Sequence, residues 1–213
     1  MPEHRTDGVG GRLRQNLFTR VAGWPLRTPT VRRGRKSDSV EFLKLLGKLA
    51  EFEHLEPPSE EGKKRIMNDI FEDRKLGLFV APVGRRLVGY ALYFYSYSSF
   101  LAKPTLYLED IFVLEQNRRK GIGLALFRAC AREAVRERCG RLEWAVLRWN
   151  KKAIRFYENL GARRLDDWAH YRLTAEEAKR VYGFHAKPGS QGEKGPQFQV
   201  RKAKLRSLVG HHL

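Results

Sequence analysis

The chain has 213 residues and a formal net charge of +18, and hydrophobic residues make up 42% of it. This length suits one domain, or one domain with tails, and the hydrophobic share is enough for a buried core. The apolar stretches are only a few residues long, which excludes a transmembrane helix. The N-terminal segment lacks the apolar region of a secretory signal.

The two cysteines, Cys130 and Cys139, do not have the number or spacing of a disulfide framework. No His or Cys spacing indicates zinc, so we expect no metal site. This cysteine usage is typical of a reducing compartment, and we therefore expect a cytoplasmic protein.

The positive charge is spread over the whole chain. Residues 1–29 carry five Arg against two acids, and residues 187–213 carry six Lys and Arg against one acid. Both ends are polar and without periodicity, so we expect flexible basic tails around a domain at residues 30–186. The charge makes polyanionic partners plausible, from nucleotide cofactors to nucleic acid, although no nucleic-acid-binding motif accompanies it.

The first elements are a short edge strand at residues 30–35 and a helix after it. Asp38, with Glu41 three residues later, resembles the capping box that starts a helix, and Pro57 ends that helix. Glu53 falls three helical turns after the first apolar residue of the helix. It therefore lies at the end of the buried stripe.

Helices and strands alternate along the rest of the chain. We expect helices at residues 59–73, 124–138 and 151–160, and strands at residues 78–82, 87–97, 105–114, 142–147 and 168–173. This order predicts an α/β (α+β) fold in which a central mixed sheet carries helices on both faces.

The strand at residues 105–114 is apolar on both faces, as expected of a central, doubly covered strand. Strict alternation places Leu106, Leu108, Phe112 and Leu114 on one face and Tyr107, Ile111 and Val113 on the other.

Two adjacent carboxylates, Glu109 and Asp110, lie in the middle of this strand. An ionised carboxylate in an apolar strand is paired, protonated or functional. One interpretation is a structural ion pair with an Arg or Lys. The other is that one of the two faces a cleft, where a raised pKa lets it take a proton from an amine.

A basic glycine loop follows the strand and leads directly into a helix, with the sequence Arg118-Arg119-Lys120-Gly121-Ile122-Gly123. Glycines allow backbone N–H groups to approach a ligand closely, and the helix N-terminus adds partial positive charge. The loop therefore predicts a phosphate-binding site. A plain surface turn is the alternative interpretation.

A third segment begins with Trp149 and Asn150 and continues through Phe156 and Tyr157 to Gly161. Asn150 is a good N-cap for the helix, and Gly161 is suited to end it. The pattern alone makes Tyr157 a core residue whose hydroxyl finds a partner.

Taken together, these segments resemble the acetyl-CoA signature of the GNAT N-acetyltransferases over residues 30–175. Within that superfamily, residues 106–113, Trp149-Asn150 and residues 49–53 resemble the diamine (spermidine/spermine) acetyltransferase branch. The resemblance implies a mostly antiparallel mixed sheet, acetyl-CoA as co-substrate, a small amine substrate and a homodimer.

The resemblance also implies residue roles. Tyr157 is expected to protonate the departing thiolate, and Glu109 to act as general base, directly or through a water. The expected cofactor contacts come from Ile111, Phe112, Val113, Arg118, Arg119, Lys120, Gly121, Ile122, Gly123, Leu124, Asn150 and Tyr157. The expected substrate contacts come from Glu53, Glu109 and Asp110. The amine is expected to attack directly in a ternary complex, where proximity supplies much of the rate.

The chain departs from the branch at Tyr97-Ser98-Ser99-Phe100, where the branch carries a substrate-binding acid. Thialysine, another diamine or an amino acid therefore stand beside polyamines as acceptors. Two alternatives remain: an acetyltransferase acting on protein N-termini or lysines, and a nucleic-acid-binding protein in which the acetyltransferase fold is incidental.

Overall fold

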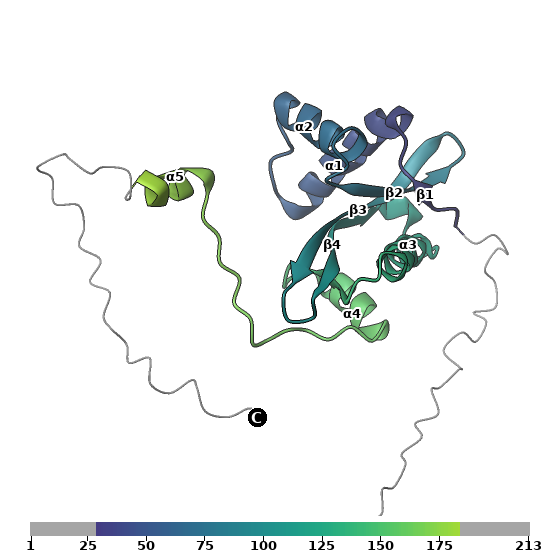
Figure 1. Cartoon of the computed structure of the whole chain (residues 1–213). Coiled ribbons are helices and arrows are strands. Elements are labelled where there is room, and N and C mark those ends of the chain that lie inside the picture. Colours follow the sequence, from purple (N-terminus) through teal and green to yellow (C-terminus); the bar gives the residue numbers. More distant parts are fainter. Residues whose placement is uncertain (1–28, 184–213) are drawn as a thin grey trace, which may run out of the picture. The chain divides into compact units, whose positions relative to one another are not determined.

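The structure is a computed structural model that describes residues 29–183 (Figure 1). The tails expected at residues 1–29 and 187–213 lie outside the described residues, except for residue 29. The chain divides into two compact units, one ending at Arg155 and the other beginning at Phe156. No helix in residues 29–183 is long and apolar enough to cross a membrane.

The first unit is built on a five-stranded sheet whose spatial order follows the chain. Its strands are β1 (Arg32–Arg33), β2 (Gly77–Val83), β3 (Arg86–Ser98), β4 (Lys103–Val113) and β5 (Arg141–Trp144). Neighbouring strands are antiparallel except for the parallel pair β4 and β5. A parallel pair needs a crossover connection, and here it runs through α3 (Ile122–Arg136).

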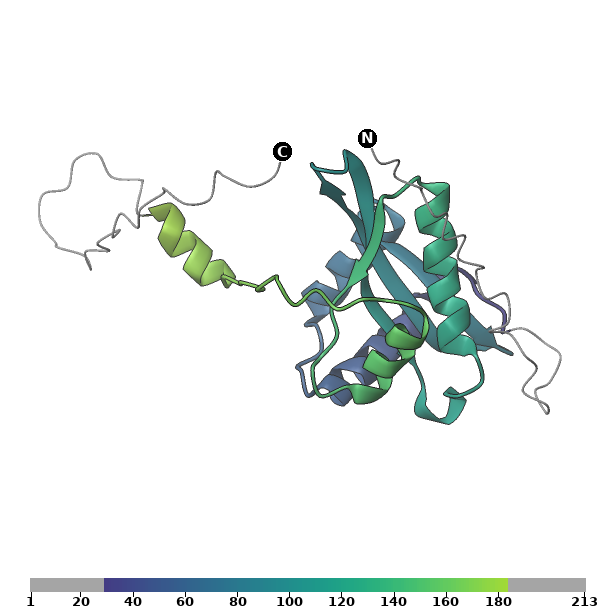
Figure 2. The ribbon, with the colours of Figure 1, turned by 90° about the horizontal axis from the view of Figure 1, so that it is seen from below.

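Helices cover both faces of this sheet (Figures 1 and 2). On one face, α1 (Ser39–Glu53) and α2 (Glu60–Phe71) pack their apolar side chains against Val80, Tyr90 and Phe112. On the other face, α3 packs Leu126 and Cys130 against the sheet. The predicted α/β class, with a mixed and mostly antiparallel sheet between helices, is confirmed.

The start of α1 was predicted correctly, but its chemistry was not. Asp38 occupies the N-cap position without capping the helix by its side chain. Instead Arg32 donates two hydrogen bonds to the Asp38 carboxylate, at 2.6 and 2.9 Å, and the Arg35 backbone N–H donates a third at 2.7 Å. The carboxylate therefore ties β1 and the turn at Arg35 to the start of the helix, and it does not form the predicted capping box with Glu41.

The alternation predicted for β4 is wrong beyond its midpoint. Pairing with β3 shifts between Leu92–Asp110 and Tyr93–Leu108, so Glu109 is the extra residue of a β-bulge. After the bulge the faces exchange: Ile111 and Val113 pack with Leu106 and Leu108 on the α3 side. Phe112 packs on the opposite side, under α1.

The strand expected at residues 168–173 does not form. The chain there is without regular structure, and Trp168 and Tyr171 are 74% and 94% exposed. The second unit instead contains α5 (Ala175–Gly183), which the periodicity analysis did not predict. It also holds the end of α4 (Lys151–Asn159), which Gly161 follows at a φ of 86°.

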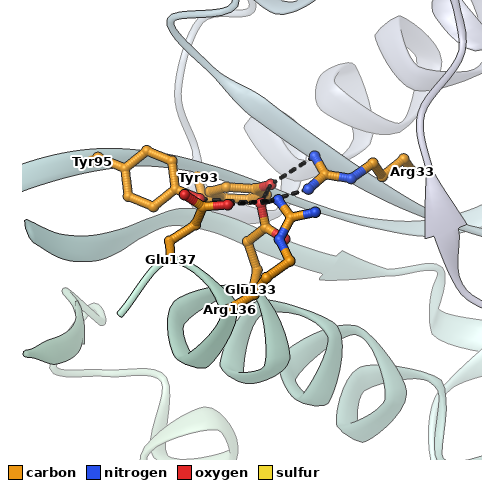
Figure 3. Close-up of polar contacts among 6 residues, drawn as sticks. All are labelled: Arg33, Tyr93, Tyr95, Glu133, Arg136 and Glu137. Carbon is orange, nitrogen blue, oxygen red and sulfur yellow. Dashed lines mark hydrogen bonds and ion pairs between the residues drawn. The ribbon is translucent and has the colours of Figure 1, made fainter. Parts of the chain in front are cut away.

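A buried carboxylate fastens α3 to the sheet (Figure 3). Glu133 is 6% exposed, and its Oε1 accepts hydrogen bonds from Arg33, Arg136, Tyr93 and Tyr95 at 2.5–3.1 Å. Burial alone would raise the pKa of Glu133, but the hydrogen bonds from Arg33 and Tyr93 hold it below its ordinary value. This cluster joins β1, β3 and α3 through one oxygen atom.

We expect Glu133→Gln to lower the free energy of unfolding by about 2 kcal/mol, because the variant leaves partly buried donors without their charged acceptor. The control is Glu137→Gln, which removes an exposed carboxylate that also pairs with Arg136, at 2.9 Å. That change should cost less than about 1 kcal/mol. Urea unfolding of the three proteins measures both effects, and equal losses would contradict the proposed anchor.

Candidate active site

The pairing between β4 and the edge strand β5 stops partway along β4. Their pairing runs from Thr105–Arg141 to Leu108–Trp144, where β5 ends, whereas β4 continues to Val113. Within the described residues, the β5 side of positions 109–113 therefore has no strand partner. The sheet opens beside the bulge, at the strand end that leads into the glycine loop.

The register shows which backbone groups face this open edge. Leu114 N–H donates to Val88 O at 2.9 Å, which makes that pair a hydrogen-bonded one. In an antiparallel ladder such pairs alternate, so Phe112 exchanges its bonds with Tyr90. The backbone groups of Ile111 and Val113 then point away from β3 toward the open edge. The N–H and C=O of Ile111 and the N–H of Val113 have the geometry to extend the sheet with a ligand that carries amide groups, whereas Val113 O accepts a hydrogen bond from Arg118 Nε.

The basic glycine loop lies at the end of this edge and makes a tight turn. Arg119 and Gly121 both adopt left-handed backbone conformations, with φ of 59° and 76°. The first hydrogen bond of α3 runs from Ala125 N–H to Gly121 O at 2.9 Å. The N–H groups of Ile122, Gly123 and Leu124 precede it and have no partner inside the helix.

Several features make this helix start suitable for phosphate. A Cβ added at Gly123 would meet no heavy atom within 4 Å, so the protein's own packing does not require glycine there. The side chains of Arg119 and Lys120 are exposed beside the helix N-terminus. N–H groups without a partner inside the helix, the helix dipole and two exposed cations together suit a pyrophosphate.

Arg118 behaves differently from its two basic neighbours. Its Nε donates to Val113 O at 3.0 Å, and its guanidinium lies 5.0 Å from the ring centroid of Phe52 and 5.9 Å from that of Phe112. Phe52 also contacts Trp149, with ring centroids 5.4 Å apart. Arg118 is therefore turned toward β4 and the end of α1.

Three carboxylates, those of Glu53, Glu109 and Asp110, lie close enough for the charges of the first two to act on the third. Tyr90 Oη donates to Asp110 Oδ2 at 3.3 Å. Burial and the nearby charges of Glu109 and Glu53 raise the pKa of Asp110 to about 7. Burial also raises the pKa of Glu53, whose charge acts on Tyr90 as well. An acidic cluster that shares few hydrogen bonds with cations is suited to binding an amine.

The structure tests the predicted helix positions of two residues, Asn150 just before α4 and Tyr157 within it. Asn150 Oδ1 accepts the Ala153 N–H at 3.1 Å, which confirms its N-cap role. Tyr157 is 8% exposed on α4. The structure thus gives Asn150 a helix-capping function, and Tyr157 is buried as the pattern alone predicted.

Sequence reasoning placed Glu53 and Asp110 in one site, and the structure brings their charges together. It missed Tyr90 as the hydrogen-bond donor to Asp110, and it missed Phe52 as the platform for Arg118. Only contacts between different elements identify these two residues, because each also fits the buried apolar pattern of its own element.

The raised pKa of Asp110 predicts a pH-dependent cost to stability. The folded protein holds the Asp110 proton up to pH of about 7, against an ordinary value of 3.8, so stability falls as the pH rises between these values. Asp110→Asn cannot ionise. The melting temperature of Asp110→Asn minus that of the wild type should therefore increase from pH 5 to pH 8.

The matched control for this measurement is Glu115→Gln, an exposed acid just after β4. Its melting temperature should follow that of the wild type at both pH values. A constant difference between Asp110→Asn and the wild type across this range would show that Asp110 ionises normally.

Comparison with known proteins places this site in context. The chain matches the acetyltransferase (GNAT) family over residues 41–162. It is 33% identical over 165 residues to the thialysine N-epsilon-acetyltransferase of Mus musculus, covering 72% of this chain and 96% of that protein. It is 45% identical over 95 residues to the L-ornithine N5-acetyltransferase of Arabidopsis thaliana, covering 45% of this chain and 42% of that one.

Solved structures agree on the fold. A probable acetyltransferase superposes with a TM-score of 0.62 at 22% identity, covering 68% of this chain and 97% of that chain. A possible acetyltransferase from Clostridium difficile 630 also gives 0.62 at 22% identity, covering 70% and 99%. With a family match over more than half of its residues and this fold, the chain belongs to the acetyltransferase (GNAT) family.

Proposed function

We propose that this enzyme transfers the acetyl group of acetyl-CoA to a primary amine of a small diamine or amino-acid-like substrate, within a domain at residues 30–186. The observation that carries the proposal is the acidic cluster of Glu53, Glu109 and Asp110 beside the open edge of β4. Because the chain as a whole carries +18, this local acidity is a specific feature of the site.

The family implies acetyl-CoA as co-substrate, and the residues at the open edge fit it. Ile111 and Val113 would bond the amides of the pantetheine arm, while the N–H groups of residues 122–124 and the cations of Arg119 and Lys120 would hold the pyrophosphate. When bound, acetyl-CoA supplies an activated thioester carbonyl. No covalent acyl-enzyme is needed, because the amine can attack that carbonyl directly.

Four side chains of the protein would then bind the substrate cation and transfer protons. Asp110 and Glu53 would hold the cationic end of the acceptor, and Glu109 would remove the proton from the attacking amine. As the new C–N bond forms and the C–S bond breaks, Tyr157 would donate a proton to the departing sulfur. The roles of Glu109 and Tyr157 rest on the family resemblance.

We propose an amino acid with a terminal side-chain amine as the acceptor. The relatives named above act, by name, on thialysine and ornithine, which share that chemistry. The chain lacks the acid that the polyamine branch carries before β4, at Tyr97-Ser98-Ser99-Phe100. A shorter acceptor with one distal cation therefore fits better than spermine.

The homodimer expected from the resemblance stays a prediction, as does the cytoplasmic location. The large exposed apolar side chains of the second unit support the dimer, since an interface would remove such surface from water. They include Leu165, Trp168, Tyr171, Leu173 and Tyr182.

A CoA-release assay tests the proposed function against thialysine, ornithine, spermidine and a lysine peptide. We expect the highest kcat/KM with thialysine or ornithine. Tyr157→Phe should lower kcat roughly 100-fold, the scale of general-acid catalysis, with little change in the Kd of acetyl-CoA. Tyr171→Phe, the same change at a 94% exposed tyrosine, should have no effect.

Two results would contradict this account. Turnover of the peptide alone would favour a protein acetyltransferase. Full activity of Tyr157→Phe would return that residue to a purely structural role.

A further inference from the structure

One cation of the basic glycine loop, Arg118, is directed at β4 and α1 rather than at the start of α3. Arg119 and Lys120 are exposed, whereas Arg118 is half-buried. The bond from its Nε to Val113 O uses the carbonyl at the end of the open edge. The side chain of Arg118 thus fastens the loop to β4.

The same guanidinium contacts both elements that carry the acidic cluster, α1 and β4. It lies over Phe52, the residue before Glu53, and over Phe112, two residues after Asp110. A guanidinium over an aromatic face is attracted to the electron density of the ring, and more strongly where water is excluded. Arg118 therefore contacts residues close in sequence to Glu53 and Asp110, the two acids proposed to hold the acceptor.

A second contact extends this connection. The ring of Phe52 packs against Trp149, and Trp149 precedes the Asn150 cap of α4. Phe52 is the shared member, since it touches both Arg118 and Trp149. The end of α1 is thus held between the cofactor loop and the start of α4.

We propose that Arg118 is a positioning residue that couples the two substrates: binding of acetyl-CoA orders residues 118–124, and Arg118 passes this order to the end of α1 that carries Glu53. The inference rests on the proposed function. When one ligand orders groups that a second ligand needs, the second binds more tightly. The effect is reciprocal, so the acceptor also tightens cofactor binding by the same factor.

The experiment measures the Kd of thialysine by calorimetry with and without saturating CoA, which binds without turnover. Cooperative sites commonly differ by about 5-fold or more, and we expect CoA to tighten thialysine binding by at least that factor. Arg118→Gln should bring the factor close to one. Arg118→Lys should not rescue it, because an ammonium lacks the planar fork.

Changes at Phe52 provide an independent test away from the loop. Phe52→Leu removes the ring under Arg118 and should also abolish the coupling, while Phe52→Tyr keeps the ring and should retain it. The matched control is Arg119→Gln, which removes the same charge from the same loop. It should weaken CoA binding but leave the coupling factor unchanged.

The outcomes separate the two proposals. If the wild type binds both ligands independently, or if Arg118→Gln behaves like Arg119→Gln, the inference is overturned and the proposed function stands. If the wild type binds neither CoA nor thialysine, the proposed function fails and takes the inference with it.

Discussion

The site depends on one constraint, the separation of β4 and β5 after Leu108. Two parallel strands that paired throughout would satisfy each other's backbone groups and leave nothing for a ligand. Here β5 ends at Trp144, so Ile111 and Val113 keep backbone groups directed at the opening. The bulge at Glu109 lies at the same level and sends the next carboxylate, Asp110, to the α1 face.

Two buried carboxylates of the first unit have opposite effects on the stability of the fold. Asp110, an acid whose pKa is raised to about 7 by burial, destabilises the fold at neutral pH. Glu133 has the opposite character, because four donors hold it ionised between β1, β3 and α3. Glu133 thus stabilises the packing of α3 on β1 and β3, while Asp110 lies on the part of β4 that has no β5 partner.

Local signals in the sequence predicted the loop and the helix start well, because glycine, charge and helix polarity act within a few residues of Gly121. Features set by a partner in a different element were missed. Asp38 was placed correctly at the helix start, but its partner Arg32 lies outside the helix, in β1. The bulge at Glu109 is invisible to alternation, since an inserted residue leaves the apolar composition of the strand unchanged. The strand expected at residues 168–173 has the right composition and no partner in the described chain.

Amide hydrogen exchange by NMR, with and without saturating CoA, tests the central claim most directly. If the open edge of β4 binds the cofactor, CoA should slow exchange at the amides of Ile111 and Val113. The amide of Phe112 is directed at Tyr90 of β3, so its exchange rate should not change. Unchanged exchange at Ile111 and Val113 in a protein that calorimetry shows to be saturated with CoA would contradict the account.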